Sequence, residues 1–261
     1  MALAALIQSD PDAKCDATLA LWAQRDALAC DPSEALSFEG TLPGRPGRPL
    51  LVTHTQVPRR SPHTPEGRAA LMHAICHIEF NAINLALDAI WRFDGMPLAY
   101  YWDWLLVAQE EAQHFRMVRE HLRRLGHDYG SFEAHQGLWQ MCDRTAQDVT
   151  ARMALVPRTL EARGLDATPP IQDKLRQVGD HEAVAILDVI LRDEVGHVRI
   201  GNHWYLFRCQ MEGLDPISHY DYLTALHEAP KPRPPLNLSA REAAGFTPEE
   251  LAKLMASTKA A

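Results

Sequence analysis

The sequence lacks several features that mark particular protein classes. Its five cysteines are odd in number, widely spaced and form no C-x-x-C pair, which argues against a disulfide framework or a cysteine-based zinc site and fits a reducing compartment. The sequence contains no run of about 18 apolar residues, so it predicts no membrane span. The N-terminus lacks the basic and apolar regions of a signal peptide. We therefore expect a cytoplasmic protein with no membrane partner.

The sequence also has no excess of positive charge and no alternation of apolar and polar residues typical of strands. A formal net charge of −8 provides no global field that would attract nucleic acid, so we do not expect nucleic acid as a partner. A chain of 261 residues, 46% of them hydrophobic, can bury one good core with additional segments around it. The fold class predicted is all-α.

Helix-start and helix-stop residues divide the chain into three parts. Residues 1–65 are predicted to hold an N-terminal helix, over 12–29, and an extended arm whose many prolines exclude helix. Residues 66–213 are predicted to form a four-helix core, and residues 214–261 a C-terminal extension, all within one domain. The expected core helices run over residues 65–93, 98–125, 139–163 and 180–212, with a short helix before Gly179.

Two of these helices carry a glutamate and a histidine three residues apart. The pairs are Glu111 with His114 and Glu194 with His197. Three residues turn a helix by about 300°, so both side chains of a pair lie on one face and can bind one metal ion. Taken singly, such a pair is more often a solvated contact on a helix surface. Both pairs, however, lie in mid-helix on apolar faces, where unpaired charge is costly.

Each pair is preceded by a lone glutamate at nearly the same distance along the chain. Glu79 lies 32 residues before Glu111, and Glu161 lies 33 residues before Glu194. The repeated order, Glu followed by E-x-x-H, is the ligand set of a di-iron or di-manganese carboxylate bundle. Four buried carboxylates would repel one another, whereas two divalent cations would balance their charge. The six predicted metal ligands are Glu79, Glu111, His114, Glu161, Glu194 and His197.

Other features leave alternatives open. Pro157, four residues before Glu161, either kinks the helix and re-aims Glu161 or marks the junction of two shorter helices. Gly196 indicates either close packing and room for a ligand, or simply a tolerated glycine. His73 and His77 lie near Glu79 but have no partner at ligand spacing, so we expect neither to bind the metal.

At these residues the sequence resembles the ferritin-like superfamily and, more narrowly, a bacterial family known as domain of unknown function 455. More distantly it resembles the tRNA-modifying di-iron hydroxylases. The resemblance covers roughly residues 66–213, through stretches such as His77-Ile-Glu-Phe80, Glu110-Glu-Ala-Gln-His-Phe115 and Ile190-Leu-Arg-Asp-Glu-Val-Gly-His197. It implies a ferritin-like four-helix bundle with two iron ions, Glu111 and Glu194 bridging them, Glu79 and Glu161 as terminal ligands, and one histidine on each metal.

The function expected from this ligand set is an O₂-activating oxidase or monooxygenase. Its partners would be O₂, a small-molecule substrate and an electron donor. The sequence identifies neither the substrate nor the donor. The chain is compatible with a homodimer. Mn/Fe and Mn pairs use the same ligand types as two Fe ions. The alternative is an iron-handling or peroxide-detoxifying protein without an organic substrate, and a third reading is a metal-stabilised structural protein.

Overall fold

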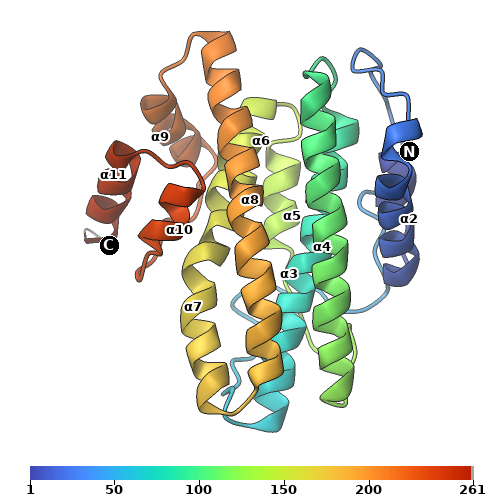
Figure 1. Ribbon diagram of the computed structural model, residues 1–261, viewed down its shortest axis with the longest axis vertical. Coiled ribbons are helices and arrows are strands. Elements are labelled where there is room, and N and C mark those ends of the chain that lie inside the picture. The colour runs from blue at the N-terminus through green and yellow to red at the C-terminus, as the bar shows by residue number, and fades with distance from the viewer. Residues whose placement is uncertain (260–261) are drawn as a thin grey trace. The chain divides into compact units, whose positions relative to one another are not determined.

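The computed structural model describes residues 1–259 and is all-α over that range (Figure 1). The last two residues of the expected C-terminal extension lie outside the described residues. The chain divides into two compact units, residues 1–139 and 140–261, which are described separately. The helical elements are α1 (Ala2–Leu6), α2 (Pro11–Ala23), the 3₁₀ helix η1 (Arg25–Ala27), α3 (Pro65–Arg92), α4 (Leu98–Arg124), α5 (Gly137–Arg144), α6 (Val149–Leu155), the π-helix η2 (Val156–Glu161), α7 (Ala162–Gln177), α8 (His181–Glu212), α9 (Pro216–Leu226), α10 (Leu238–Ala243) and α11 (Pro248–Lys259).

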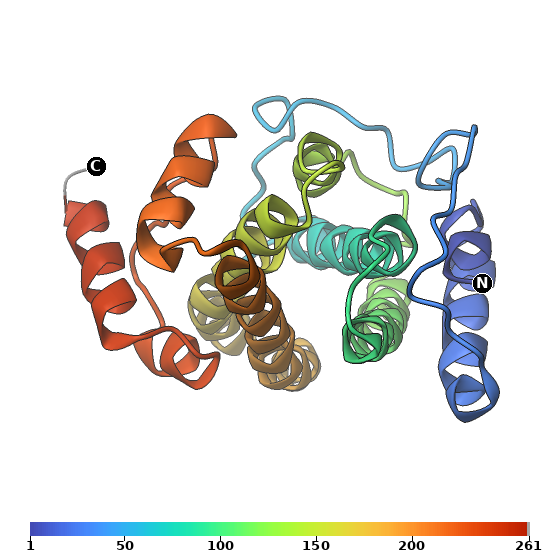
Figure 2. The same ribbon diagram turned by 90° about the horizontal axis from the view of Figure 1, so that it is seen from above.

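The first unit is built on a hairpin of two long helices, α3 and α4, which lie side by side in both views (Figures 1 and 2). Thr64 caps α3 by accepting a hydrogen bond from Gly67 N, and Pro65 occupies its first turn. The connection turns at Gly95, whose φ of 71° favours glycine. Tyr101 Oη, at the start of α4, donates to Phe93 O at 2.9 Å and closes the hairpin.

The apolar character of α3 is explained by burial within this unit. By length and composition α3 could cross a membrane, with a mean hydropathy of 1.2 over its most apolar window, but 78% of that window is buried. This is the pattern of a core helix packed on all sides, and as evidence for a membrane span it is weak.

The proline-rich arm is extended, as expected, and is fastened to the connection that follows α4. Val52 N donates to Ala134 O at 2.9 Å, and Ala134 N donates to Leu50 O at 3.0 Å. The predicted N-terminal helix over residues 12–29 is too long, because α2 ends at Ala23 and is followed by the short 3₁₀ helix.

A buried lysine joins the N-terminal helices to the hairpin. Lys14 is fully buried, and its Nζ donates to Leu6 O and Asn84 Oδ1, both at 2.6 Å. Burial, with a smaller contribution from the charge of Arg45, lowers the pKa of Lys14 to about 7. Two carbonyl oxygens match the two N–H groups of a neutral amine, so the site accepts the uncharged form.

The second unit is also built on a hairpin, of α7 and α8, with α6 and η2 packed against α8 (Figure 2). Gly179 has a φ of 75° at the turn. Asp180 caps α8 by accepting from Ala183 N at 3.1 Å, as the sequence predicts. At the other end Gly213 is left-handed and terminates α8 after Glu212, also as predicted.

The prediction for the third core helix is wrong in its continuity. Instead of one helix ending at Gly164 and a short one after it, the chain forms α5, α6 and η2, and then α7 continues through Gly164 and Pro169. A proline leaves the carbonyl four residues earlier without its helical donor. For Pro169 that carbonyl is Leu165 O, and Asn237 Nδ2 donates to it at 3.2 Å. The helix therefore continues because a distant side chain replaces the missing bond.

The C-terminal extension packs against α7 and α8 through short helices. Arg241 of α10 pairs with the buried Asp166 of α7, Nη2 to Oδ2 at 2.6 Å. The final helix begins with a capping box: Thr247 N donates to Glu250 Oε2 at 2.8 Å, and Glu250 N donates to Thr247 Oγ1 at 3.3 Å.

Pro157 lies in the π-helix η2, so the two alternatives for it resolve into one irregular turn that joins α6 to α7. A Cβ at Gly201 of α8 would lie 2.4 Å from Pro157 Cβ, which is far too close. Gly201 thus permits η2 to approach α8. A Cβ at Gly196 would meet no atom of the described residues within 4 Å.

Alanine substitutions at these two glycines of α8 should change the free energy of unfolding in opposite directions. We expect Gly201→Ala to lower the free energy of unfolding by about 1–3 kcal/mol through overpacking. Gly196→Ala should raise it by up to about 1 kcal/mol through helix propensity. Urea unfolding of both variants measures the difference, and the same sign in both would contradict the packing described here.

Lys14 predicts a pH dependence of stability. Because its folded pKa, about 7, lies below the ordinary lysine value of 10.5, the unfolded chain binds more protons between these two values. The contribution of Lys14 to stability therefore rises with pH across that window. In Lys14→Met this rise should be missing. Denaturant unfolding of both proteins at a series of pH values measures the difference, and identical pH profiles would show that Lys14 does not titrate in this way.

Candidate metal centre

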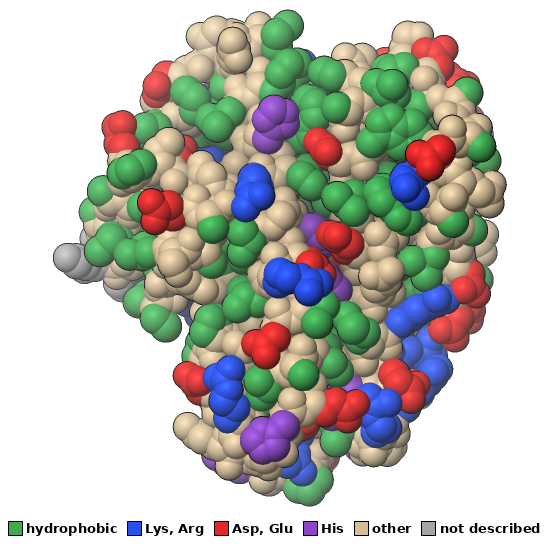
Figure 3. Space-filling model, in the orientation of Figure 1, with side chains coloured by type: hydrophobic (Ala, Val, Ile, Leu, Met, Phe, Trp, Pro, Cys, Tyr) green, Lys and Arg blue, Asp and Glu red, His purple; other side chains and the backbone are tan. Residues whose placement is uncertain are grey.

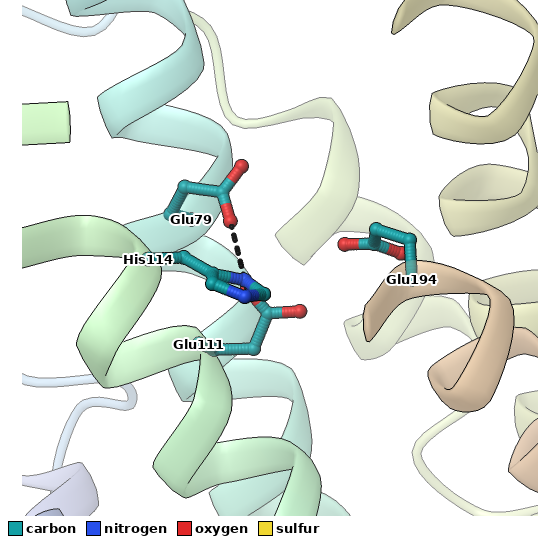
Figure 4. Close-up of side chains that lie close together, drawn as sticks. All are labelled: Glu79, Glu111, His114 and Glu194. Atoms are coloured by element: carbon teal, nitrogen blue, oxygen red, sulfur yellow. Dashed lines mark ion pairs between the residues drawn. The ribbon is translucent and has the colours of Figure 1, made fainter. Parts of the chain in front are cut away.

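The first unit brings three of the predicted ligands together. Glu79 comes from the middle of α3, and Glu111 and His114 come from the middle of α4. His114 Nδ1 lies 3.4 Å from Glu79 Oε2 and 3.5 Å from Glu111 Oε2. The ligand atoms of the three residues lie within 4.8 Å of one another. Figure 4 shows the two carboxylates beside the imidazole ring, with the Glu79–His114 ion pair dashed.

The cluster lies in an apolar part of the hairpin. Glu79 is 3% exposed, Glu111 is fully buried and His114 is 1% exposed. Residues near these ligands along α3 and α4 are themselves buried, among them Cys76, Ile83, Val107, Phe115 and Val118. A helix pair that buries two carboxylates among such neighbours must neutralise their charge.

The protonation of His114 follows from this setting. Burial by itself lowers the pKa of His114, but the contacts with Glu111 and Glu79 and their negative charges outweigh it and raise the pKa to about 11. The imidazole is therefore cationic at neutral pH when no metal is bound. A divalent cation bound by these residues would displace this proton and supply positive charge in its place beside the two carboxylates.

The second unit positions the other three predicted ligands. Glu194 and His197 lie on α8, with Glu194 Oε1 3.8 Å from His197 Nδ1, and Figure 4 labels Glu194. Glu161 is the last residue of η2, the element packed against α8. Glu161 is 8% exposed, Glu194 is 9% exposed and His197 is 1% exposed. This unit thus repeats the donor types of the first: two carboxylates and one imidazole at buried positions.

The donor set fits a divalent transition metal. Carboxylate oxygen and imidazole nitrogen suit Fe²⁺, Mn²⁺ and Zn²⁺, and the described residues of the first cluster include no thiolate that would select a softer ion. Cys76 is a turn away from Glu79, but burial raises the pKa of its thiol well above the usual range. The buried Glu/His cluster could therefore bind a metal ion.

His73 and His77 form hydrogen bonds with the connection that follows α4. His73 Nε2 accepts from Gly130 N at 3.0 Å. His77 Nδ1 lies 2.9 Å from Tyr129 Oη, and its Nε2 lies 3.0 Å from His135 O. Burial lowers the pKa of both imidazoles to about 4. Both rings are therefore neutral and fasten the connection after α4 to α3.

The arginines of α4 are paired with acids of their own unit. Arg119 Nη1 lies 3.0 Å from Asp12 Oδ1, and Arg119 Nε lies 2.6 Å from Asp128 Oδ1. Arg124 Nη1 lies 3.2 Å from Glu120 Oε1. Basic and acidic side chains are interspersed on the face shown in Figure 3. These ion pairs offset the local positive charge, so the arginines by themselves do not indicate a nucleic-acid surface.

Metal binding to the first cluster should stabilise the protein. At about 100 times its dissociation constant, Mn²⁺ should raise the free energy of unfolding by about 2.7 kcal/mol, because it binds only the folded chain. We expect His114→Ala to lose most of this gain, while Glu120→Gln, an exposed change on the same helix, keeps it. Thermal unfolding with and without Mn²⁺ measures the effect, and an equal gain in the two variants would place the metal elsewhere.

Comparison with known proteins gives a family but no activity. Residues 7–252 match the family described as "Protein of unknown function (DUF455)". An "Uncharacterized protein" from Haemophilus influenzae is 54% identical over 213 residues, which cover 79% of this chain and 74% of the relative. No solved structure matches. The match covers both units and all six predicted ligands, and the chain belongs to the DUF455 family.

Proposed function

We propose that the two sets of ligands combine into one dinuclear iron centre in a ferritin-like four-helix arrangement of the α3–α4 and α7–α8 hairpins. The observation that carries this proposal is the repetition of one donor set. Each unit contributes a lone glutamate and an E-x-x-H pair on neighbouring helical elements, all at buried positions. Two identical donor sets are what a pseudo-symmetric pair of metal ions requires.

Charge balance is compatible with two divalent ions, one for each set. Each unit buries two carboxylates, and a divalent ion with a neutral imidazole compensates one such set. In the joined centre Glu111 and Glu194 would be the carboxylates shared by the two ions. Glu79 and Glu161 would be terminal ligands, and His114 and His197 would each bind one metal. The carboxylates would also screen the repulsion between the two ions.

The activity that we propose is oxidation of a small organic substrate by O₂. A reduced pair of iron ions supplies the electrons that activate O₂. The protein supplies a dry environment: large side chains such as Trp104, Phe115 and Val118 of α4 surround the ligands and are almost completely buried. After each turnover, two electrons from a separate donor would return the iron pair to its reduced state, and the substrate would supply the other two electrons that O₂ accepts. The substrate class is not defined by the ligand residues.

The direct test is O₂ consumption by the iron-loaded, reduced protein. We expect about one O₂ consumed per chain in a single turnover, because two Fe²⁺ ions deliver two electrons. Glu111→Ala should abolish this fast consumption by removing a proposed bridging ligand. The exposed change Glu120→Gln should not affect it.

The amount of iron oxidised separates the proposed activity from iron handling. An oxidase should stop after about two Fe²⁺ per chain unless a reductant is supplied. Continued oxidation of many Fe²⁺ ions per chain would favour the iron-handling alternative. Reduced protein that holds two iron ions and does not consume O₂ would contradict both activities and leave a structural role for the metal.

A further inference from the structure

The π-helix η2 ends at a proposed metal ligand, Glu161. A π-turn contains one residue more than an α-turn, so the same chain could form a regular α-helix with its register moved by one residue. Such a move would rotate Glu161 by about 100° around the helix axis. The position of this carboxylate therefore depends on what holds η2 in its present register.

Arg158, in the middle of η2, is held by residues from outside it. Its side chain is 2% exposed. Arg158 Nη1 donates to Asn202 Oδ1 of α8 at 2.7 Å. Arg158 Nη2 forms a buried ion pair with Glu250 Oε1 of α11, 92 residues later in the chain. Since α8 also carries Glu194 and His197, the bond to Asn202 ties η2 to the helix that holds the other ligands of this unit.

Aromatic rings surround the same guanidinium group. Its Cζ lies 5.1 Å from the ring centroid of Tyr205, 5.1 Å from that of Tyr220 and 4.7 Å from that of Phe246. Such contacts between a guanidinium group and ring faces are attractive. They come from α8, from α9 and from the turn before α11, so three segments outside η2 define where Arg158 can lie.

The neighbouring residue is held in the same way. Thr159 Oγ1 donates to Ala154 O at 2.7 Å and lies 2.8 Å from Tyr220 Oη of α9. Together with the Pro157–Gly201 approach, three consecutive residues of η2 are fixed by groups outside it. A regular α-helix at this place would move all three contacts.

We propose that Arg158, held by Glu250, is a positioning residue that keeps η2 in its π register and thereby places Glu161 for metal binding. The C-terminal helix α11 therefore helps to position a ligand of the proposed metal centre through Glu250. The inference rests on the proposed dinuclear centre, because Glu161 needs a defined position only if it is a ligand.

The test is a double-mutant cycle in which the full chain is titrated with Co²⁺. Absorption spectroscopy monitors the binding of each ion. We expect Glu250→Gln to lower the affinity for one of the two bound Co²⁺ ions by about tenfold or more, because loss of a group that orients a metal ligand commonly has an effect of this size. The other ion should be unaffected. In a Glu161→Gln background, Glu250→Gln should cause no further loss, because it acts through Glu161. Glu249→Gln, an exposed change on the same helix, is the matched control.

The outcomes separate this inference from the proposal on which it rests. Wild-type protein that binds two Co²⁺ ions, with unchanged affinities in Glu250→Gln, would overturn only the role of Arg158. An equal loss of affinity for both Co²⁺ ions in Glu250→Gln would also overturn it. So would a loss of affinity on adding Glu250→Gln to the Glu161→Gln background that equals the loss in the wild-type background. Wild-type protein that binds no second Co²⁺ would overturn the dinuclear centre. If Glu250→Gln does not fold, Tyr220→Phe removes only the hydroxyl beside Thr159 and should weaken the same ion, by less.

Discussion

Neutralisation of buried negative charge is the constraint on which this structure depends. Each of the two hairpin units places two glutamates and one histidine at buried positions of helices that are otherwise apolar. In the first unit the contacts of His114 with Glu111 and Glu79 outweigh the effect of burial and raise the pKa of the imidazole to about 11. A divalent metal ion bound by these residues would supply positive charge in place of the proton on this imidazole.

The two units solve the placement of their ligands differently. In the first, Glu79 and the Glu111–His114 pair lie on the regular helices of one hairpin, and neutral histidines and a buried lysine fasten the surrounding segments to it. In the second, the lone glutamate lies on a π-helix, which is held by contacts with α8 and the C-terminal extension. On our proposal the extension thus helps to position Glu161 without supplying a ligand.

The parts that could be predicted from the sequence depend on neighbouring residues. Caps such as Asp180 and Thr247, the glycine stop at Gly213 and the apolar faces around the E-x-x-H pairs are local patterns. The parts that could not be predicted depend on distant partners. Helix α7 passes Pro169 because Asn237 donates to the freed carbonyl, and η2 is held by Glu250, 92 residues from Arg158. Helix propensity depends on neighbouring residues and does not indicate either of these distant partners.

The central claim, that both units contribute to one centre, is tested most directly by anomalous diffraction from crystals grown with Mn²⁺. The account predicts two anomalous peaks roughly 3.5–4 Å apart, with Glu79, Glu111, His114, Glu161, Glu194 and His197 as their protein ligands. Two peaks far apart, each bound by residues of one unit only, would contradict it, and so would a single peak bound by the first unit alone.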